Sequence, residues 1–301
     1  MCNRTMKNVL ERVLFLALTV LLVSSMFTGA VSAATDNNTG NENSGATISQ
    51  EPMTLFGDIS SAVIQYFEGL KLFFEELPDK LYQNFIEDDR YKYLIEGFCN
   101  TIVITIFALI LGLVLGTCIA IVRTIHDLHG KLKVANAICK VYLAVIRGTP
   151  VMLQLLIIYF VIFAAVDVDK VLVAVVAFGV NSAAYVAEII RAGINAVPKG
   201  QFEAGASLGL PFKLTMMTII LPQAVKNILP ALCNEGITLM KETAISGYIG
   251  LVDLTKAGDI IRSQTWEAFI PLIAVALVYL VMVLILTHLV QKLERRLNNA
   301  N

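Results

Sequence analysis

Five long apolar segments follow one another along the last two thirds of the chain, and short polar stretches separate them. Each is close to the roughly 20 residues that a helix needs to cross the hydrocarbon core of a bilayer. The first and the last contain no Asp, Glu, Lys or Arg. The pattern therefore predicts an all-α integral membrane protein with five spans in its main body. The expected spans cover 101–122, 141–166, 171–190, roughly 216–244 and 268–290.

A shorter apolar stretch at 13–26 precedes these spans. Three basic residues stand before it and the small residues Ala30 to Ala33 follow it, which is the arrangement of an export signal with a cleavage site. We therefore expect a signal peptide at 1–33. The alternative is an anchor helix that is not cleaved, because the stretch extended through Ala34 is just long enough to span. Both interpretations place the next segment outside the cytoplasm.

The segment between this signal and the first span has two parts. Residues 34–53 are rich in Asn, Gly, Ser and Thr and contain little to bury, so a flexible linker is expected. Within 54–92, apolar residues recur at intervals of three and four, which predicts an amphipathic extracytoplasmic segment lying on a bilayer or on a protein surface. Residues 34–97 hold 12 acidic against 4 basic residues, so this exported part is acidic.

The composition also indicates a membrane protein. Hydrophobic residues make up 56% of the 301 residues and charged residues 16%, and the mean hydropathy is +0.72, a balance too apolar for an ordinary water-soluble domain. The short loops after the first, third and fifth spans carry most of the Lys and Arg of the main body. Because such loops stay in the cytoplasm, the first main span is expected to start outside, and the tail at 297–301 is expected to be cytoplasmic.

No motif for chemistry on a bound substrate occurs in the chain. The five cysteines are scattered without a CxxC pair, and no HExxH sequence, nucleophile elbow or P-loop occurs. We therefore expect no catalytic residue and no metal site. If the protein uses ATP, another polypeptide must bind it.

A more polar segment at 198–222 joins the third and fourth spans. Pro198 can open a helix at its first turn, and Gly209 can end that helix in the left-handed conformation. Pro211 can start the next helix with its preset φ angle. The segment is therefore expected to form a helical hairpin on the cytoplasmic side.

The hairpin sequence resembles the EAA motif found in permease subunits of binding-protein-dependent, ATP-driven (ABC) importers. The matching residues are Glu203-Ala204, Gly209, Ile219 and Leu221-Pro222. The one departure is Gly205, where that family usually has a second Ala. A glycine inside a helix costs about 0.5 to 1 kcal/mol relative to Ala. We therefore expect a slightly weaker helix with nearly the same contact shape.

Further motifs resemble the polar-amino-acid branch of these permeases, and together they cover about 91–296. They are Arg147-Gly148-Thr149-Pro150, AYVAEIIRAGI at 184–194, KGQ at 199–201, LPQA at 221–224 and KET at 241–243. The resemblance implies the five-span ABC permease fold for 93–296. The signal-like helix and the amphipathic segment before it are additions to the usual compact pattern.

The resemblance implies an importer built from two permease chains, identical or different, two ATPase subunits and an extracytoplasmic solute-binding protein. This chain would lie in the cell membrane among lipid, carry an amino acid and bind no cofactor itself, because ATP and Mg²⁺ belong to the ATPase subunits. No nucleic acid is expected among the partners. The hairpin would be the coupling element that inserts into a groove of the ATPase. Its expected contact residues are Glu203, Ala204, Gly205, Ala206, Gly209, Leu221 and Pro222.

Polar groups inside the spans mark a candidate substrate passage, because ionisable residues at membrane depth are costly and usually functional. The candidates are Asn181 in the third span and Asn234, Glu235 and Glu242 in the fourth. Glu235 and Glu242 share one helix face, and neither has a basic residue three or four positions away. We expect this face to line the passage and to favour a basic amino acid. The alternatives are that the two carboxyl groups are protonated or paired across helices, that Glu242 lies near the outer interface, and that Asn181 makes an interhelical hydrogen bond.

A break is expected near the cytoplasmic end of the second span, at the RGTP sequence. Thr149 can cap a helix whose first residue is Pro150, and Arg147 would anchor the end of the span. These three residues are therefore candidates for a structural or gating role.

Three other interpretations stay open. The hairpin could be a capped surface feature without a partner. An ion-coupled secondary carrier would transport without an ATPase, although five spans without an inverted repeat argue against it. A membrane-anchored receptor or scaffold would use the acidic segment before the first span for binding.

Overall fold

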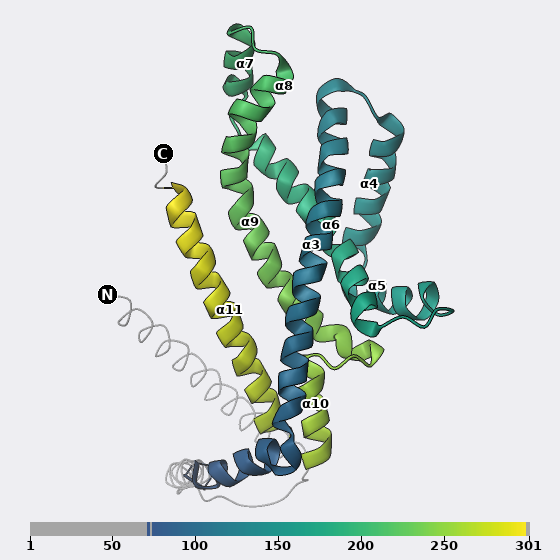
Figure 1. Cartoon of the computed structure of the whole chain (residues 1–301), viewed down its shortest axis with the longest axis vertical. Helices are drawn as coiled ribbons and strands as arrows, with labels where there is room; N and C mark the ends of the chain where they lie inside the picture. The colour runs from purple at the N-terminus through teal and green to yellow at the C-terminus, as the bar shows by residue number, and fades with distance from the viewer. Residues whose placement is uncertain (1–70, 73, 299–301) are drawn as a thin grey trace, which may run out of the picture. The chain divides into compact units, whose positions relative to one another are not determined.

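A computed structural model describes residues 71, 72 and 74–298, and every regular element in this part of the chain is a helix (Figure 1). The all-α expectation is therefore confirmed for the described residues. The signal expected at 1–33 and the linker expected at 34–53 lie outside them, as does part of the amphipathic segment expected at 54–92.

Within the described residues, four helical runs are long and apolar enough to cross a membrane. They are α3 (Tyr91–His129), α6 (Lys170–Asn195), the run 212–249 and α11 (Phe269–Asn298). The run 212–249 is continuous but changes pitch three times. Its parts are α8 (Phe212–Thr215), the π-helical turn η4 (Met216–Ile220), α9 (Leu221–Glu242) and the 3₁₀ turn η5 (Thr243–Ile249).

The second expected span is bent. The helix α4 (Lys133–Gly148) meets α5 (Val151–Ile157) and its π-helical continuation η3 (Ile158–Ile162) at an angle of 108°. Both residues between the helices, Thr149 and Pro150, have extended backbones with ψ angles of 146° and 136°. The break predicted at the RGTP sequence is therefore confirmed, and the chain has five spans if this bent pair crosses as one.

A close contact between α3 and α6 forms the middle of the fold. Gly112 and Gly116 of α3 both face α6, where an added Cβ would lie 3.0 Å from Ser182 Cβ and 2.7 Å from Val186 Cβ respectively. Small residues at this spacing let two helix backbones approach closely, which stabilises helix pairs in lipid through packing. As a result α6 is the most enclosed of the four membrane-crossing runs, with 67% of its apolar window buried.

The two ends of this helix bundle differ. At one, the hairpin end, α7 (Lys199–Ser207) and α8 project beyond α6 and α9 (Figure 1). At the other, the α10 end, the amphipathic helix α10 (Leu254–Thr265) packs beside the first turns of α3. The Asn100 side-chain amide of α3 donates a hydrogen bond to the Val252 carbonyl at 2.8 Å. The loop before α10 is therefore tied to the start of the first long helix.

Candidate functional site

The helical hairpin expected at 198–222 is present at the end of α6. α7 starts directly after Pro198 and ends at Ser207, and Gly209 follows with a φ angle of +72°. Pro211 then precedes α8. The left-handed conformation that the glycine was expected to supply is thus confirmed.

Backbone hydrogen bonds close the turn between the two helices of this hairpin. The amide of Gly209 donates to the Ala206 carbonyl at 3.0 Å, and the amide of Leu210 donates to the Gly205 carbonyl at 3.1 Å. This pair of bonds is the Schellman pattern, which satisfies carbonyls left unpaired at a helix end. The turn is therefore internally bonded and stiff.

The surface of the hairpin combines small residues with large apolar ones. Leu208, at its tip, is 76% exposed, and Phe212 is also exposed. Large apolar side chains held outward on a polar turn indicate a contact surface for another protein. Of the expected coupling residues, Gly205 is buried, Leu221 is partly buried, and Glu203, Ala204, Ala206, Gly209 and Pro222 are exposed.

The surroundings of Gly205 correct one expectation. A Cβ added there would lie 2.6 Å from Thr215 Cγ2 and 2.8 Å from Thr215 Oγ1. An alanine therefore does not fit in the present packing, and the expectation that Gly205 leaves the contact shape nearly unchanged is wrong. The physical reason is that α7 lies directly on the buried Thr215 of α8.

An ion-pair network joins α3 to α6 just before the hairpin. Arg123 Nη1 lies 2.6 Å from Glu188 Oε1, and Arg191 Nη1 lies 3.2 Å from the same oxygen. Arg191 Nη2 lies 3.0 Å from Asp127 Oδ2. Glu188 thus neutralises one cation from each helix. Because α6 ends four residues after Arg191, the network fixes the base from which the hairpin projects.

Aromatic rings join the end of α3 to the hairpin. The His129 ring at the end of α3 meets the Phe212 ring edge to face, with centroids 4.9 Å apart. The Phe202 ring of α7 also stacks on the Phe212 ring, with centroids 6.5 Å apart. The hairpin therefore touches α3 as well as the two helices to which it is covalently joined.

The two carboxylates expected to line a passage are both partly buried on α9. Ser182 Oγ of α6 donates a hydrogen bond to Glu235 Oε1 at 2.8 Å. Among the ion pairs of the described residues, none includes Glu235 or Glu242. The described part of the chain therefore supplies no cation that forms an ion pair with either carboxyl group.

Exposed polar side chains form a stripe along α9. Asn234, one of the expected passage residues, belongs to it. The members are Asn227, Asn234, Thr238 and Lys241, which follow one another at intervals of seven, four and three residues. These intervals place them on one helix face. Since polar side chains at membrane depth are unfavourable against lipid, the stripe must face water or another chain.

Asn181 lies in a different place. It is buried, and its amide donates a hydrogen bond to Gln154 Oε1 of α5 at 2.9 Å. Gln154 Nε2 in turn donates to the Ile146 carbonyl at 2.7 Å and to Thr149 Oγ1 at 2.8 Å. The interhelical bond weighed as the alternative for Asn181 is thus present, and it holds the bend between α4 and α5. Its role as a passage residue stays a prediction.

The expected cap at this bend is wrong in detail. Pro150 itself occupies the N-cap position of α5, and no side chain caps that helix. The Thr149 hydroxyl instead donates to the Val145 carbonyl at 2.9 Å, because Thr149 is the C-cap of α4 and a Thr there can reach the carbonyl four residues earlier. The guanidinium carbon of Arg147 lies 5.7 Å from the centroid of the Tyr185 ring, a cation–π contact with α6.

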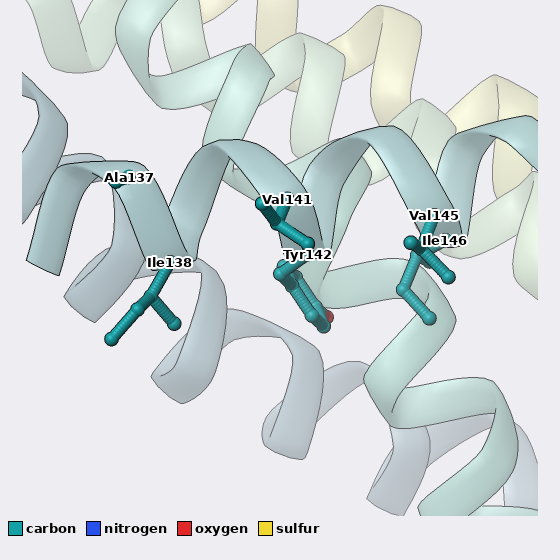
Figure 2. Close-up of a pocket in the computed structure, with 6 residues that line it drawn as sticks. All are labelled: Ala137, Ile138, Val141, Tyr142, Val145 and Ile146. Atoms are coloured by element: carbon teal, nitrogen blue, oxygen red, sulfur yellow. The ribbon is translucent and has the colours of Figure 1, made fainter.

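The exposed side of α4 carries an apolar groove (Figure 2). It is lined by Ala137, Ile138, Val141, Tyr142, Val145 and Ile146. Its one polar group, the Tyr142 hydroxyl, donates to the Val180 carbonyl. The groove thus offers no charged or amide side chain to a polar solute, and we do not treat it as a substrate site.

Several of these residues were missed by reasoning from the sequence. Gln154 was overlooked, although a glutamine inside an apolar run just after a break is a usable signal. Ser182 and Asp127 carry no local signal, because their partners belong to helices far away in the sequence.

The chain is similar to proteins of one transport family. The family described as "Binding-protein-dependent transport system inner membrane component" matches residues 112–299. The arginine transport system permease protein ArtQ of Bacillus subtilis is 43% identical over 212 residues, which cover 70% of this chain and 94% of that protein. The glutamine transport system permease protein GlnP of Escherichia coli is 37% identical over 207 residues, 68% of this chain and 92% of that protein.

Two solved structures share the fold. The structure of an amino acid ABC transporter with histidines is 41% identical, with a TM-score of 0.65 over 70% of this chain and 98% of that chain. An inward-facing structure of the MetNI methionine ABC transporter is 19% identical, with a TM-score of 0.58 over 69% of this chain and 97% of that chain.

Proposed function

Since the chain belongs to the family of binding-protein-dependent transport system inner membrane components, we propose that it is the permease subunit of an ATP-driven amino acid importer. It is a multi-pass protein of the cell membrane. Permeases of this family work with ATPase subunits and a solute-binding protein, and we infer the same partners here, together with a second permease chain. ATP and Mg²⁺ would be bound by the ATPase subunits.

The observation that carries this proposal is the hairpin. Its turn is closed by backbone hydrogen bonds, and its apolar tip at Leu208 is exposed. A tip of this kind suits insertion into a groove of an ATPase subunit. We infer that the hairpin end is cytoplasmic, which the Lys and Arg residues of the neighbouring loops support.

A movement of the hairpin has a direct route into the membrane. α8, η4 and α9 form one uninterrupted helical run, so α8 cannot shift without moving α9. The base of the hairpin also shares a core with α6 and α9, formed by Val197, Ile220, Ala224 and Ile228. Closure of the ATPase subunits would therefore displace the α9 face that carries Glu235.

We infer that this face favours a basic amino acid. Glu235 and Glu242 are paired with no cation among the described residues, and the exposed polar stripe runs along the same helix. A cationic substrate would supply the missing charge, and the amide and hydroxyl groups of Asn234 and Thr238 would hydrogen-bond its polar atoms.

Site-directed crosslinking tests the coupling role. In a variant without native cysteines, Ala206→Cys would place a thiol on the exposed hairpin, and Ser263→Cys would place one on the exposed side of α10. Ala206→Cys is expected to crosslink to the ATPase subunit and to resist an impermeant maleimide in intact cells. Ser263→Cys is expected to do the reverse. Labelling of the hairpin from outside the cell would overturn the proposal.

Transport by a charge-removing variant tests the substrate class. Glu235→Gln should lower the apparent affinity for basic amino acids about tenfold, or about 1.4 kcal/mol, and leave neutral polar ones less affected. Glu96→Gln, which removes an exposed carboxylate near the start of α3, is the matched control. Unchanged affinity and selectivity in Glu235→Gln would remove the basic-substrate assignment but not the coupling role.

A further inference from the structure

A segment that precedes the family match lies across the α10 end. Residues 74–81 are α-helical, and η1 (Tyr82–Ile86) and η2 (Glu87–Asp89) lead from them into α3. Figure 1 shows this part of the chain running crosswise to α3 and α11. We call residues 74–90 the crossing segment. It lies before residue 112, where the family match begins.

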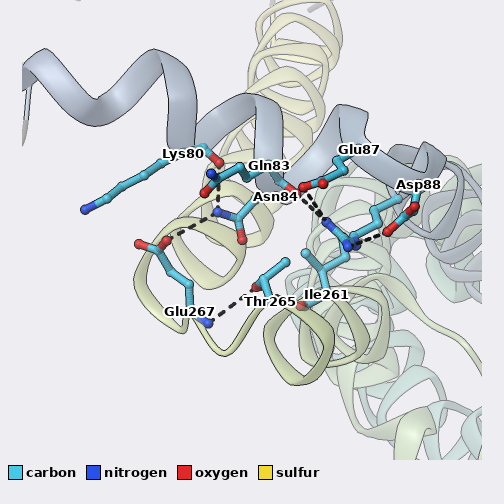
Figure 3. A network of polar contacts seen from close by, with 9 residues as sticks. Lys80, Gln83, Asn84, Glu87, Asp88, Ile261, Thr265 and Glu267 are labelled. Carbon is cyan, nitrogen blue, oxygen red and sulfur yellow. Dashed lines mark hydrogen bonds and ion pairs between the residues drawn. The ribbon is translucent and has the colours of Figure 1, made fainter.

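Polar contacts attach the crossing segment to the turn between α10 and α11 (Figure 3). Asn84 is 1% exposed, and its amide donates to the Lys80 carbonyl at 2.8 Å and to Glu267 Oε2 at 3.4 Å. Glu267 belongs to the short connection between α10 and α11. The crossing segment is therefore bound to the place where the last span begins.

The junction with α3 is also held. Arg90 Nη2 donates to Asp88 Oδ2 at 2.6 Å, and Arg90 Nη1 donates to the Gln83 carbonyl. Asp88 and Asp89 both have left-handed backbones, with φ angles of 55° and 57°. A left-handed backbone is uncommon for residues other than glycine, and Asp is one of the few types that tolerate it. The crosswise direction is thus a defined turn.

The crossing segment is amphipathic, and four of its six apolar side chains are exposed, whereas Leu77 and Phe85 are partly buried. Tyr82 is 60% exposed and Ile86 is 53% exposed. The apolar positions, at helical spacing, are Phe74, Leu77, Leu81, Tyr82, Phe85 and Ile86. The opposite side is polar, with Glu75, Glu76, Asp79, Lys80, Gln83 and Glu87. A crosswise helix with these two sides has the character of an interfacial helix.

The only tryptophan of the chain lies beside this segment. Trp266 is 94% exposed in a left-handed conformation, directly before the Glu267 that Asn84 contacts. Phe269, the first residue of α11, is exposed as well. Trp and Tyr side chains are enriched at the level of the lipid headgroups.

We propose that the crossing segment and the turn around Trp266 form one lipid-facing patch that lies in the membrane–water interface at the α10 end. The apolar run α11 begins at Phe269, just after Trp266, and the uncharged stretch of α3 begins at Thr101, so the patch lies near the level at which the spans enter the membrane. Exposed apolar side chains also follow along the chain on the first turns of both spans, Ile95 on α3 and Leu272 and Ile273 on α11. This continuity favours lipid over a protein partner as the occupant. The inference needs only the membrane position of the chain and not the proposed transport function.

Fluorescence of the single tryptophan tests the proposal. The full chain is placed in lipid nanodiscs, which leave both membrane faces open to solutes. Trp266 is expected to lose most of its emission to lipids brominated near the headgroup and little to aqueous iodide. A water-like emission spectrum with strong iodide quenching and no quenching by brominated lipid would overturn the proposal.

A matched pair of variants extends the test to the crossing segment. In a Trp266→Phe background, Tyr82→Trp moves the reporter to the apolar side and Gln83→Trp moves it to the polar side one residue away. The first should be quenched by brominated lipid and the second by iodide. Equal iodide quenching at both positions contradicts the assignment. Shielding that appears only after a solute-binding protein is added would identify a protein-docking surface and overturn the lipid assignment.

Discussion

Gly97 of α3 lies directly against the backbone of Asp253, since a Cβ added to Gly97 would come within 2.6 Å of the Asp253 carbonyl oxygen. This approach buries the Asp253 residue completely at the start of α10. Oδ2 accepts a hydrogen bond from the Thr255 amide at 2.9 Å, whereas Oδ1 has no hydrogen-bond partner. Lys256 instead donates to Asp259 at 2.8 Å. Burial without a cation raises the pKa of Asp253 from 3.8 to about 6.

Asp253 should make the protein less stable as the pH rises. The folded state holds this proton up to about pH 6, whereas the unfolded state releases it near 3.8. The stabilisation by the bound proton is therefore complete below 3.8 and is lost as the pH rises through 6, a change of about 3 kcal/mol. Thermal unfolding of the purified chain between about pH 4.5 and 7.5 measures it.

Asp253→Asn should flatten the pH dependence of the unfolding temperature. At neutral pH this variant should unfold at a higher temperature than the unchanged protein. Asp259→Asn is the control, because hydrogen bonds from Lys256 and Arg262 lower the pKa of Asp259. The unfolding temperature of the control should still fall as the pH rises. An equal slope in Asp253→Asn and the unchanged protein would contradict the assignment.

Gly205→Ala should impair the hairpin although alanine favours helices. The helix gains about 0.5 to 1 kcal/mol, but forcing a Cβ against Thr215 costs about 1 to 3 kcal/mol. Coupled ATPase activity and transport are expected to fall. Adding Thr215→Ala removes Thr215 Cγ2 and Oγ1, the two atoms that the new Cβ would meet, and should restore ATPase activity and transport. Failure of the double variant to recover would show that the Thr215 contact is not the cause.

Gln154→Ala should destabilise the bend between α4 and α5. It removes the acceptor of the buried Asn181 amide and the donor to the Ile146 and Thr149 carbonyls. The cost is about 1 to 3 kcal/mol for each buried group that is left unpaired. Gln223→Ala, which removes one hydrogen bond to the Ile219 carbonyl, is the matched control. Thermal unfolding should fall further for Gln154→Ala, and an Asn181→Ala background should reduce the difference. Equal effects of the two glutamine variants would contradict this account.

Glu188→Gln should loosen the contact between α3 and α6 at the hairpin end. It leaves Arg123 and Arg191 facing each other without the shared carboxylate, and partly buried pairs of this kind contribute roughly 1 to 3 kcal/mol. Thermal unfolding at low and high salt measures the effect, since screening should destabilise the unchanged protein more than the variant. Asp127→Asn, at the more exposed end of the network, should cost less. The same salt response in Glu188→Gln and the unchanged protein would refute it.

The spans, the hairpin and the break were predictable from the sequence because each depends on neighbouring residues. Length and apolarity mark α3 and α11 as membrane helices. Pro198, Gly209 and Pro211 define the hairpin through their own backbone preferences. The backbone between α4 and α5 departs from the helix at Thr149 and Pro150, as the RGTP sequence predicts.

Tertiary structure alone decided which distant side chains meet. The sequence of α6 contains Asn181 and Glu188, but their partners Gln154 and Arg123 come from α5 and α3. The need for glycine at position 205 likewise depends on where a second helix lies. Such contacts depend on which helices lie side by side. The apolar periodicity of one helix does not specify which helix packs against it. The local sequence therefore determined the elements, and packing determined the polar pairs between them.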